Sequence, residues 1–568
     1  MKTGIRAYTV AGFCALFLSL SACGPKAPPT APPAGIESTA AVALDPAAFW
    51  NSATIYFLLT DRFVNGDPTN DLALGRTREG AFLRTYQGGD LAGVLQKLEE
   101  GYFEDLGVDA IWMTPFQEQN HGSTDEGTGR TYAYHGYWIQ DWTAVDPALG
   151  TEDDLRAVVE AAHERGIRVL MDAIINHTGP VTSEDPVWPD DWVRTTPKCE
   201  FDDYTTTVNC TLVDNLPDIL TASDEDVELP RRLLEKWQRE GRLVQEVTEL
   251  DEYFARTGHP RAPRYYLIKW LTDWVREFGF DGYRVDTAKH FEEWVSAELK
   301  VEAERAFEDW KAAQPDPVSE DLPFYMMGEV YNYNINNGRH FAFGNGDAVD
   351  FFDYGYDGLI NFDFSDRSDE SLDQLFTRYA AALEGELRGV SILNYVSSHD
   401  DDTPWDPARE YPLQTGTRLL LAPGGAQIYY GDEVARPLVV EGARGDANLR
   451  SNMVWQDLES GACTGEILEH WRKLGQFRHD HPAVGAGEHQ RLRVEPYIFS
   501  RTLEMDGITD RVIVAMGLEA GPKTIFVYGL FPDGAELVDG YSGETATVMN
   551  GEITLVTDFD LILLGERR

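Results

Sequence analysis

Cysteine is scarce in this chain, which has only five cysteines among its 568 residues. No pair of them has the spacing, supported by histidines, that is typical of zinc ligands. Chemistry based on a transition metal is therefore not expected. Cys199 and Cys210 would close a short loop, and an exported protein could form a disulfide there, but the sequence leaves this pairing open and gives Cys463 no counterpart.

Positive charge is also in short supply. The 48 Lys and Arg residues stand against 96 Asp and Glu residues, which gives a formal net charge of −48. Such a surface repels nucleic acid and anionic membranes, so nucleic acid is not expected as a partner and a neutral substrate is favoured. Hydrophobic residues make up 43% of the chain, which is enough for the large core of a globular protein.

Long apolar runs are missing except near the N-terminus. There, Lys2 and Arg6 precede an apolar stretch over residues 7–20. That stretch has about the length of the apolar part of a secretory signal and is too short to span a bilayer. We therefore expect a signal peptide over residues 1–22 and export of the mature protein.

Residues 20–24 read Leu-Ser-Ala-Cys-Gly, which resembles the lipobox of bacterial lipoproteins. The resemblance implies that Cys23 is lipidated, and that the Pro- and Ala-rich stretch over residues 23–45 is a tether to a bacterial membrane. Gly24, rather than Asp, after the cysteine favours the outer membrane. Membrane contact is then expected only through this anchor. The alternative is an ordinary cleavage site with a chance cysteine.

Apolar strand-like runs alternate with helical patterns along most of the chain, as in parallel α/β folds. The runs are Thr54–Leu59, Ala110–Met113, Arg168–Ala173, Gly282–Val285, Tyr325–Gly328, Leu359–Phe364, Ser391–Val396 and Gln427–Tyr429. Eight such runs predict a closed (β/α)8 TIM barrel.

Two further domains interrupt or follow the barrel. The third and fourth runs are separated by far more chain than one crossover helix requires, so residues 178–263 are predicted to form an inserted domain beside the barrel. After about residue 490, short alternating runs such as Thr524–Tyr528 predict a C-terminal all-β sandwich over residues 490–568. The barrel then comprises residues 46–177 and 264–489.

Three separated carboxylates each follow an apolar run: Asp286, Glu329 and Asp400. The carboxyl ends of barrel strands share one rim, so we expect the three side chains to converge there. Paired carboxylates are what acid/base chemistry on a glycosidic bond needs. The pattern therefore points to a glycoside hydrolase.

Four motifs resemble those of the α-amylase family (family 13 type), which are (β/α)8 glycoside hydrolases acting on α-glucans. They are residues 172–177 (Asp-Ala-Ile-Ile-Asn-His), 282–290 (Gly-Tyr-Arg-Val-Asp with the later Lys-His), 328–330 (Gly-Glu-Val) and 399–400 (His-Asp). Each motif alone is weak evidence for the family, but four motifs in this order at strand ends are specific evidence for it. Ser398 stands where many members of the family have Asn. This difference bears on which subfamily the chain resembles and not on its activity.

The resemblance implies a retaining double displacement, in which Asp286 is the nucleophile and Glu329 is the general acid and then the base. Asp400 resembles the third carboxylate, which binds sugar hydroxyls. Arg284 lies two residues before Asp286, on the same face of the strand, and would keep that carboxylate ionised and oriented.

Further residues resemble the family's substrate contacts. Residues 134–138 (Tyr-His-Gly-Tyr-Trp) match an aromatic platform motif, in which Tyr137 would stack on a sugar ring. The remaining implied contacts are His135, His177, Lys289, His290 and His399.

Calcium is the implied metal, because clustered hard oxygen ligands suit Ca²⁺. The first candidate site, which resembles the N-terminal calcium loop of cyclodextrin-active and maltogenic members, comprises Asn65, Asp67, Asn70, Asp71, Gly88 and Asp90. A polar turn rich in Asn and Asp is the alternative reading of that loop. A second site is suggested by Asn176 and Asp218, similar to the calcium that fixes the inserted domain to the barrel.

The expected partner is an α-glucan oligosaccharide or polysaccharide, while the sequence does not indicate an oligomeric state. One alternative is a cyclodextrin-active or transglycosylating enzyme of the same family. Cyclodextrin glucanotransferases normally carry further β domains after the all-β domain, which favours hydrolysis. Another alternative is a non-catalytic glycan-binding lipoprotein, although both Asp286 and Glu329 are present.

Overall fold

The computed structural model describes residues 44–567, apart from 315–321, 367–369, 402, 461–463 and 506–507. The predicted signal peptide, Cys23, most of the predicted tether and Cys463 lie outside the described residues. In the part that is described, no helix combines the length and the apolar character that crossing a membrane requires.

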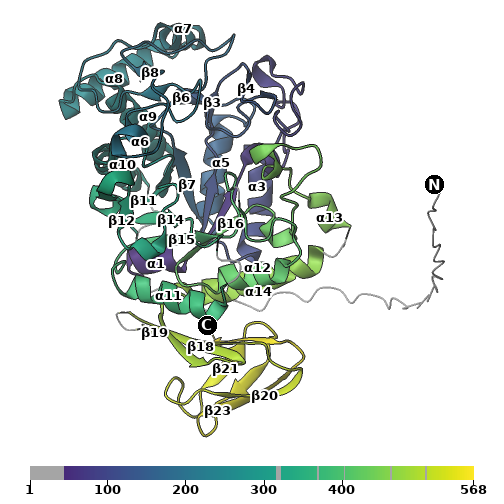
Figure 1. Cartoon of the computed structure of the whole chain (residues 1–568). Helices are drawn as coiled ribbons and strands as arrows, with labels where there is room; N and C mark the ends of the chain where they lie inside the picture. The colour runs from purple at the N-terminus through teal and green to yellow at the C-terminus, as the bar shows by residue number, and fades with distance from the viewer. Residues whose placement is uncertain are drawn as a thin grey trace, which may run out of the picture. The chain divides into compact units, whose positions relative to one another are not determined.

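Eight parallel strands close into a barrel, as predicted (Figure 1). They are β1 (Thr54–Leu58), β2 (Ala110–Met113), β7 (Arg168–Ala173), β10 (Gly282–Val285), β11 (Tyr325–Gly328), β14 (Gly358–Asn361), β15 (Ser391–Tyr395) and β16 (Gly425–Tyr429). Almost every residue in these strands is buried, which explains why they read as continuous apolar runs. Only the sixth differs noticeably from its predicted run, because the chain turns after Asn361 instead of continuing the strand.

Helices surround the barrel. The longer ones are α3 (Leu91–Glu99), α5 (Glu152–His163), α9 (Pro263–Phe278), α10 (Glu293–Ala313), α11 (Leu372–Glu384), α12 (Pro412–Leu420) and α14 (Thr464–Asp480). The sequence explains their limits locally. In α5, for example, Thr151 and Asp154 form a reciprocal capping box at the start, while Gly166 adopts a left-handed conformation in the turn that follows.

Short elements fill the connections between barrel strands and helices. Short helices are α1 (Pro46–Ser52), α2 (Thr60–Phe63), α4 (Tyr102–Asp105), α13 (Trp455–Glu459) and α15 (Ala483–Ala486). Strand pairs are β3 (Gln117–Gln119) with β6 (Ile139–Val145), β4 (Thr124–Asp125) with β5 (Arg130–Thr131), and β12 (His340–Ala342) with β13 (Ala348–Asp350).

The long connection between β7 and β10 contains two short strands and three helices before α9. These are β8 (Val193–Arg194), α6 (Tyr204–Val208), β9 (Asp218–Ile219), α7 (Arg231–Glu240) and α8 (Leu243–Thr257). Trp192 is fully buried and its ring lies 6.2 Å from that of Trp270 in α9, so this connection shares the core of the barrel. Cys199 and Cys210 form a disulfide with a Cα–Cα distance of 4.9 Å, which resolves the pairing that the sequence left open.

The C-terminal region is all-β. A six-stranded sheet has the order β17 (Glu488–Arg493), β18 (Tyr497–Met505), β19 (Ile508–Met516), β24 (Leu561–Glu566), β21 (Glu536–Asp539) and β22 (Thr545–Thr547). A second sheet pairs β20 (Gly521–Phe526) with β23 (Glu552–Thr557). On β19, Ile513 and Ala515 face the core between the two sheets, whereas Val512 and Val514 join the core of the barrel. The large sheet therefore buries both of its faces.

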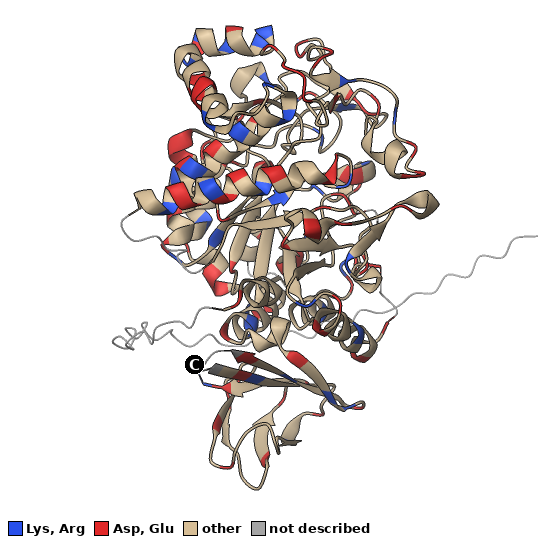
Figure 2. Cartoon of the chain, turned by 90° about the vertical axis from the view of Figure 1, so that its left-hand side faces the viewer, with Lys and Arg blue, Asp and Glu red and all other residues tan. Residues whose placement is uncertain are grey.

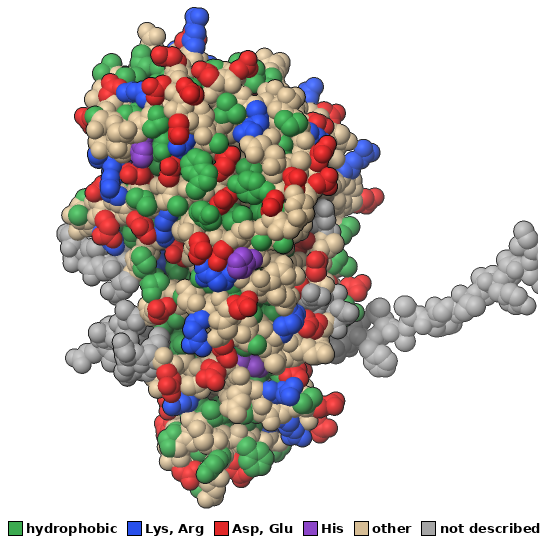
Figure 3. Space-filling view, turned by 60° about the vertical axis from the view of Figure 1, so that its left-hand side comes forward, with side chains coloured by type: hydrophobic (Ala, Val, Ile, Leu, Met, Phe, Trp, Pro, Cys, Tyr) green, Lys and Arg blue, Asp and Glu red, His purple; other side chains and the backbone are tan. Residues whose placement is uncertain are grey.

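Charged side chains cover the outer surface. Acidic and basic residues alternate along the outer helices (Figure 2), and acidic side chains are scattered over the face drawn in Figure 3 with basic ones between them. Part of this charge is paired, as between Arg256 of α8 and Glu302 of α10, whose side chains approach to 2.7 Å.

Candidate active site

A buried arginine holds three carboxylates at the carboxyl ends of neighbouring strands. Arg284 of β10 pairs with Asp286 Oδ1 at 2.7 Å, with Asp172 Oδ1 at 2.9 Å and with Glu329 Oε1 at 2.9 Å. Its side chain is completely shielded from solvent. A guanidinium presents several N–H donors in a fixed plane, so one arginine can orient carboxylates that come from β7, β10 and the end of β11.

Asp172 was part of a recognised motif, but the sequence analysis gave it no role. Besides its ion pair with Arg284, it accepts hydrogen bonds from Trp112 Nε1 at 3.0 Å and from the Tyr137 hydroxyl at 2.8 Å. It is buried. Asp172 thus holds both the Arg284 guanidinium and the Tyr137 hydroxyl in place, without lining the pocket itself.

The two predicted reacting carboxyls differ in proton affinity. Burial raises the pKa of Asp286 to about 6, against the opposing charge of Arg284. Burial also raises the pKa of Glu329 to about 7, again opposed by Arg284 and reinforced by the negative charge of Asp286. The Thr287 backbone N–H donates to Glu329 Oε2 at 2.9 Å. Glu329 therefore keeps its proton to a higher pH than Asp286, which gives one ionised carboxylate beside one carboxylic acid.

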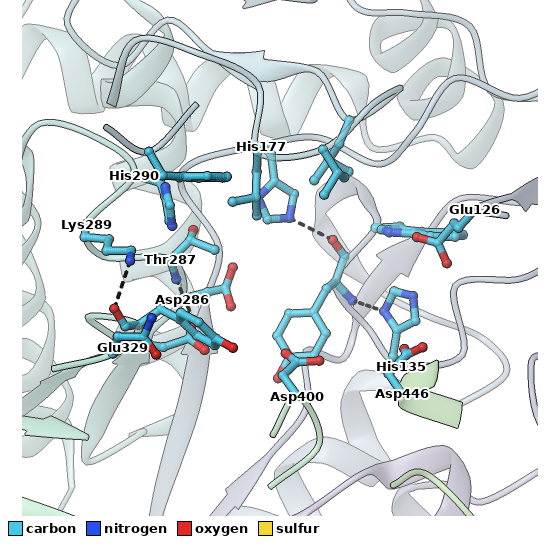
Figure 4. A pocket seen from close by; sticks show the side chains of 18 of the residues that line it. Glu126, His135, His177, Asp286, Thr287, Lys289, His290, Glu329, Asp400 and Asp446 are labelled. Carbon is cyan, nitrogen blue, oxygen red and sulfur yellow. Dashed lines mark hydrogen bonds between the residues drawn. The ribbon is translucent and has the colours of Figure 1, made fainter. Parts of the chain in front are cut away.

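Asp400 has the opposite electrostatic environment. Its carboxylate lies 2.9 Å from His399 Nε2 and also forms an ion pair with Arg450, while 44% of its side chain is exposed. The surrounding protein opposes ionisation, but the interactions with His399 and with the positive charge of Arg450 hold the pKa of Asp400 well below its usual range. Arg450 in turn pairs with Asp446 at 2.6 Å. Asp400 is therefore a permanently charged group opposite the other two carboxyls (Figure 4).

Hydrogen bonds that involve the Tyr137 backbone hold the aromatic platform motif, residues 134–138, in place. The Tyr137 N–H donates to His135 Nδ1 at 3.1 Å, and His177 Nε2 lies 3.1 Å from the Tyr137 carbonyl oxygen, where it can donate (Figure 4). The Tyr137 ring lies against the His399 ring, with 5.2 Å between centroids and 17° between planes. Burial lowers the pKa of His177 to about 4, so this ring is neutral at ordinary pH.

Lys289 and His290 reach the pocket from the loop after β10. Lys289 Nζ donates to the Tyr331 carbonyl oxygen at 2.8 Å, and burial lowers its pKa to about 8 although Glu329 opposes this. His290 Nδ1 lies 3.2 Å from the Thr207 carbonyl oxygen of the inserted region, and burial lowers the pKa of this ring to about 3. His290 is thus a neutral contact between the barrel and the insert.

These groups surround a pocket of 560 Å³, within the range of small-molecule sites. Eight predicted residues line it: His135, Tyr137, His177, Asp286, Lys289, His290, Glu329 and Asp400. Arg284 and His399, also predicted as substrate contacts, are buried behind the carboxylates they hold and do not line the pocket.

Sequence reasoning missed several lining residues. They are Glu126, Trp138, Phe201, Leu212, Val213, Leu216, Thr287, Tyr331, Asn332, Asp446 and Arg450. Phe201 and Val213 flank the Cys199–Cys210 disulfide, so the cysteines were the available signal for that wall. The spacing of four between Asp446 and Arg450 could have suggested an ion pair, but nothing local placed it beside Asp400.

The first predicted calcium loop is compact. The Asn65 amide donates to Asp71 Oδ1 at 2.8 Å. A Cβ on Gly88 would come within 2.6 Å of both side chains, and its φ of +97° favours glycine at this position.

Two other members of the loop are already engaged. Asp90 caps α3 and accepts backbone N–H bonds from Gly66, Asp67 and Gly93, and the Asp67 carboxylate accepts from Thr69. The Asn70 Oδ1 atom is buried without a hydrogen-bond partner among the described residues. The predicted residues are neighbours, but the Asp90 oxygens are committed to the backbone.

The second predicted pair shows a different pattern. As placed, the Asn176 amide oxygen faces only acceptors, the His290 carbonyl oxygen at 2.9 Å and Asp218 Oδ1 at 3.1 Å. The amide nitrogen faces only donors, so turning the amide satisfies both of its ends, with the NH₂ group donating to the two oxygens. The unturned amide would instead offer its oxygen to a cation, and Ca²⁺ accepts such ligands at about 2.4 Å. Arg194 Nε approaches the other Asp218 oxygen at 2.8 Å.

No three His, Cys, Asp or Glu side chains within the described ranges are grouped so that they could hold a metal ion. A site at Asn176 and Asp218 would instead use one carboxylate, one amide and one main-chain oxygen, which is a donor set that Ca²⁺ accepts.

Comparison with known proteins decides the family. The family model described as "Alpha amylase, catalytic domain" matches residues 57–461. The chain belongs to the alpha-amylase family. The periplasmic alpha-amylase of Escherichia coli K12 is 36% identical over 505 residues, which cover 78% of this chain and 69% of that protein. This alpha-amylase family chain spans smaller shares, 37% and 58%, of two further curated relatives.

Solved structures support the fold. The alpha-amylase of Geobacillus thermoleovorans, determined with acarbose, has a TM-score of 0.62 at 23% identity and covers 91% of this chain and 99% of its own. CldA, described as the first cyclomaltodextrin glucanotransferase with a three-domain ABC distribution, has a TM-score of 0.62 at 20% identity and covers 91% and 99%. A cyclomaltodextrin glucanotransferase can therefore have only three domains, so the number of β domains does not separate hydrolases from transferases.

Proposed function

We propose that this alpha-amylase family glycoside hydrolase cleaves α-1,4-glucosidic bonds with retention, using Asp286 as nucleophile and Glu329 as acid and base. The observation that carries the proposal is the single Arg284 guanidinium bridging both carboxyls, at 2.7 and 2.9 Å. A single guanidinium that contacts both carboxyls keeps them at short range, as a retaining mechanism with about 5 Å between them requires.

In the first step, Asp286 attacks the anomeric carbon while Glu329 donates its proton to the glycosidic oxygen. The bond to the leaving sugar breaks, and a covalent glycosyl ester forms on Asp286. In the second step, Glu329 takes a proton from water, the hydroxide oxygen bonds to the anomeric carbon and Asp286 leaves as a carboxylate. The pKa order of the pair, about 6 for Asp286 and about 7 for Glu329, supports these roles.

Asp400 would stabilise the positive charge that develops on the sugar ring, because its own negative charge is fixed by Arg450 and His399. Its negative charge also favours the protonated form of Glu329. His135, His177 and Tyr137 would contact sugar hydroxyls and the ring face on one side, and Lys289 and His290 on the leaving-group side.

We further propose that Ca²⁺ binds between Asn176, Asp218 and the main-chain oxygen of His290. When bound, the ion would hold the inserted region against the barrel. The proposal is supported by the closeness of the Asn176 amide to the His290 carbonyl oxygen, at 2.9 Å, and to Asp218 Oδ1, at 3.1 Å. That first loop, around Asn65 and Asp71, remains a second candidate through Asn70, whose Oδ1 atom is buried and unbonded among the described residues.

Export and anchoring are also proposals. The similarity to a periplasmic alpha-amylase is consistent with export. Lipidation of Cys23 and attachment to the outer membrane rest on the sequence alone, since these residues lie outside the described part of the chain.

The mechanism is tested by Asp286→Asn and Glu329→Gln. We expect kcat on maltoheptaose to fall by about three orders of magnitude or more in each variant, because each removes a group that reacts. Both amides keep the size of the carboxyl, so melting curves and maltoheptaose binding should stay near those of the parent. Hydrolysis at more than a tenth of the parent rate would exclude the assigned role. Proton NMR of the first product separates retention from inversion.

Transglycosylation is the second candidate, because cyclomaltodextrin glucanotransferases are among the similar proteins. Chromatography of the products from starch distinguishes the two. Linear maltooligosaccharides support hydrolysis, whereas cyclodextrins as the main early product would favour the transferase.

A further inference from the structure

A second pocket, of 650 Å³, lies away from the catalytic residues. Its walls come from the start of α11, the loop after β15, α12, α14 and the C-terminal strands. Figure 1 shows α11, α12 and α14 between the barrel and the C-terminal sheet. The lining includes Glu370, Ser371, Trp405, Tyr411, Gln414 and Tyr541. Its volume exceeds that of the catalytic pocket, at 560 Å³.

One wall is a stripe along α12. Gln414 and Thr417 are three residues apart in α12, and Tyr411 directly precedes the helix; all three side chains line the pocket. Tyr411 is 53% exposed, and its side chain makes no capping hydrogen bond to the helix. Gln414 is exposed as well. Tyr411 therefore presents part of its ring to the cavity and not to the core.

The opposite wall is held in place by a buried histidine. His470 of α14 contacts the Tyr541 hydroxyl through Nδ1 at 2.6 Å and the Leu413 carbonyl oxygen through Nε2 at 2.8 Å. It therefore ties together α14, α12 and the C-terminal sheet. Tyr541 is also held edge-on against Phe559, with 5.0 Å between ring centroids. The cavity is a formed site, and its walls do not have to move to make it.

The lining suits an uncharged, polyhydroxylated ligand. Three rings, those of Trp405, Tyr411 and Tyr541, line the cavity. The exposed Gln414 amide offers hydrogen bonds, whereas the Thr417 hydroxyl already donates to the Leu413 carbonyl oxygen at 3.0 Å. The Glu370 carboxylate is already paired with Arg378 at 2.5 Å. The pocket holds acidic and basic groups together, so no single charge on a ligand is favoured, in contrast to an ion site.

We propose that this pocket is a non-catalytic binding site for a second stretch of α-glucan. The inference rests on the α-glucan specificity proposed above. A polymeric substrate supplies many glucose units to one molecule, so a chain held here raises the local concentration of substrate at the catalytic pocket. The loop that follows β15 carries both Asp400 and Trp405, five residues apart, so the same segment contributes to both sites.

The test uses two variants in the full chain. Tyr411→Ala with Gln414→Ala removes the exposed stripe, and both residues are exposed, so the fold should persist. Tyr528→Ala is the matched control, because Tyr528 is an 87% exposed tyrosine that does not line the pocket. Each is examined alone for kinetics and in an Asp286→Asn background for affinity electrophoresis in gels with soluble starch.

We expect the stripe variant to lose kcat/KM on soluble starch by about 3- to 10-fold, as the loss of one stacking contact of about 1 kcal/mol implies. Its kcat/KM on maltotriose should stay within about twofold of the parent, since so short a chain cannot occupy both sites. Retardation in the starch gel should weaken in the stripe variant and persist in the control.

Unchanged retardation and unchanged starch kinetics in the stripe variant would overturn the proposal, as would an equal loss in Tyr528→Ala. An equal loss on starch and on maltotriose would also overturn it, because the stripe would then act on catalysis itself. Failure of the underlying function is a separate result, since it would abolish maltotriose hydrolysis by the parent enzyme.

Discussion

At the scale of single residues, the site depends on how three carboxyl groups share the buried Arg284 guanidinium. Arg284 faces Asp172, Asp286 and Glu329, and the first of these is further satisfied by Trp112 and Tyr137. Burial outweighs the attraction of Arg284 at both reacting carboxyls, and the negative charge of Asp172 further raises the pKa of Asp286. Both carboxyls therefore keep raised pKa values.

These pKa values predict a narrow, bell-shaped pH profile of kcat/KM. Activity requires Asp286 ionised, so it falls as the pH drops below about 6, and it requires Glu329 protonated, so it falls as the pH rises above about 7. The maximum should lie between these values. Initial rates on maltoheptaose at low substrate from pH 4 to 9 provide the measurement. A rate that stays level from pH 5 to 9 would contradict the assignment of acid and nucleophile.

The sequence predicted the reacting residues better than it predicted the residues that hold them in place. Asp286 and Glu329 follow strands directly, so the geometry of the barrel alone brings them together. Arg450 lies fifty residues beyond Asp400 in the chain, and its contact with that carboxylate arises from the path of the last connection of the barrel. No pattern of local sequence encodes such a path, because it depends on how distant segments pack.

At the scale of elements, the inserted region shapes one side of the site through a few fixed points. The bridge between His177 and Asp218 joins the end of β7 to the insert, and the Ile219 N–H donates to the Asn176 carbonyl oxygen at 2.8 Å. The sequence indicated the insert by its length, but its contacts with the barrel were visible only for the pair Asn176 and Asp218.

Calcium removal tests that junction. With excess chelator we expect the melting temperature to fall by several degrees, since an ion at about 100 times its Kd contributes about 2.7 kcal/mol to stability. Asp218→Asn should remove most of this response, because it deletes one charged ligand while keeping the side-chain shape. Differential scanning calorimetry of parent and variant, with and without chelator, gives the comparison.

Asp67→Asn is the matched variant for the first predicted loop. If its response to chelator equals that of the parent while Asp218→Asn is insensitive, calcium binds at the insert. The reverse pattern would place the ion in the loop around Asn65. An identical melting curve for the parent with and without chelator would exclude both sites.

At the scale of the whole molecule, the N-terminal segment predicts where the enzyme works. If Cys23 is lipidated, Cys23→Ser should move the enzyme from the membrane fraction to the soluble fraction with kcat and KM unchanged, because Asp286, Glu329 and Asp400 all lie far downstream in the chain. Amylase assays on fractions of cells expressing each form give the result. Fully soluble parent activity would rule out the anchor.

The burial of both faces of the C-terminal sheet also bears on how this enzyme could evolve. Phe499 of β18 packs against Phe376 of α11, with 5.7 Å between ring centroids, and Arg501 donates to the Leu421 carbonyl oxygen at 2.8 Å. A sheet from another family member would arrive with side chains fitted to different helices, and each mismatch would leave a cavity or an unpaired buried group. Recombination between relatives should therefore succeed when the crossover lies before α11, so that the last barrel helices and the sheet are inherited as one block.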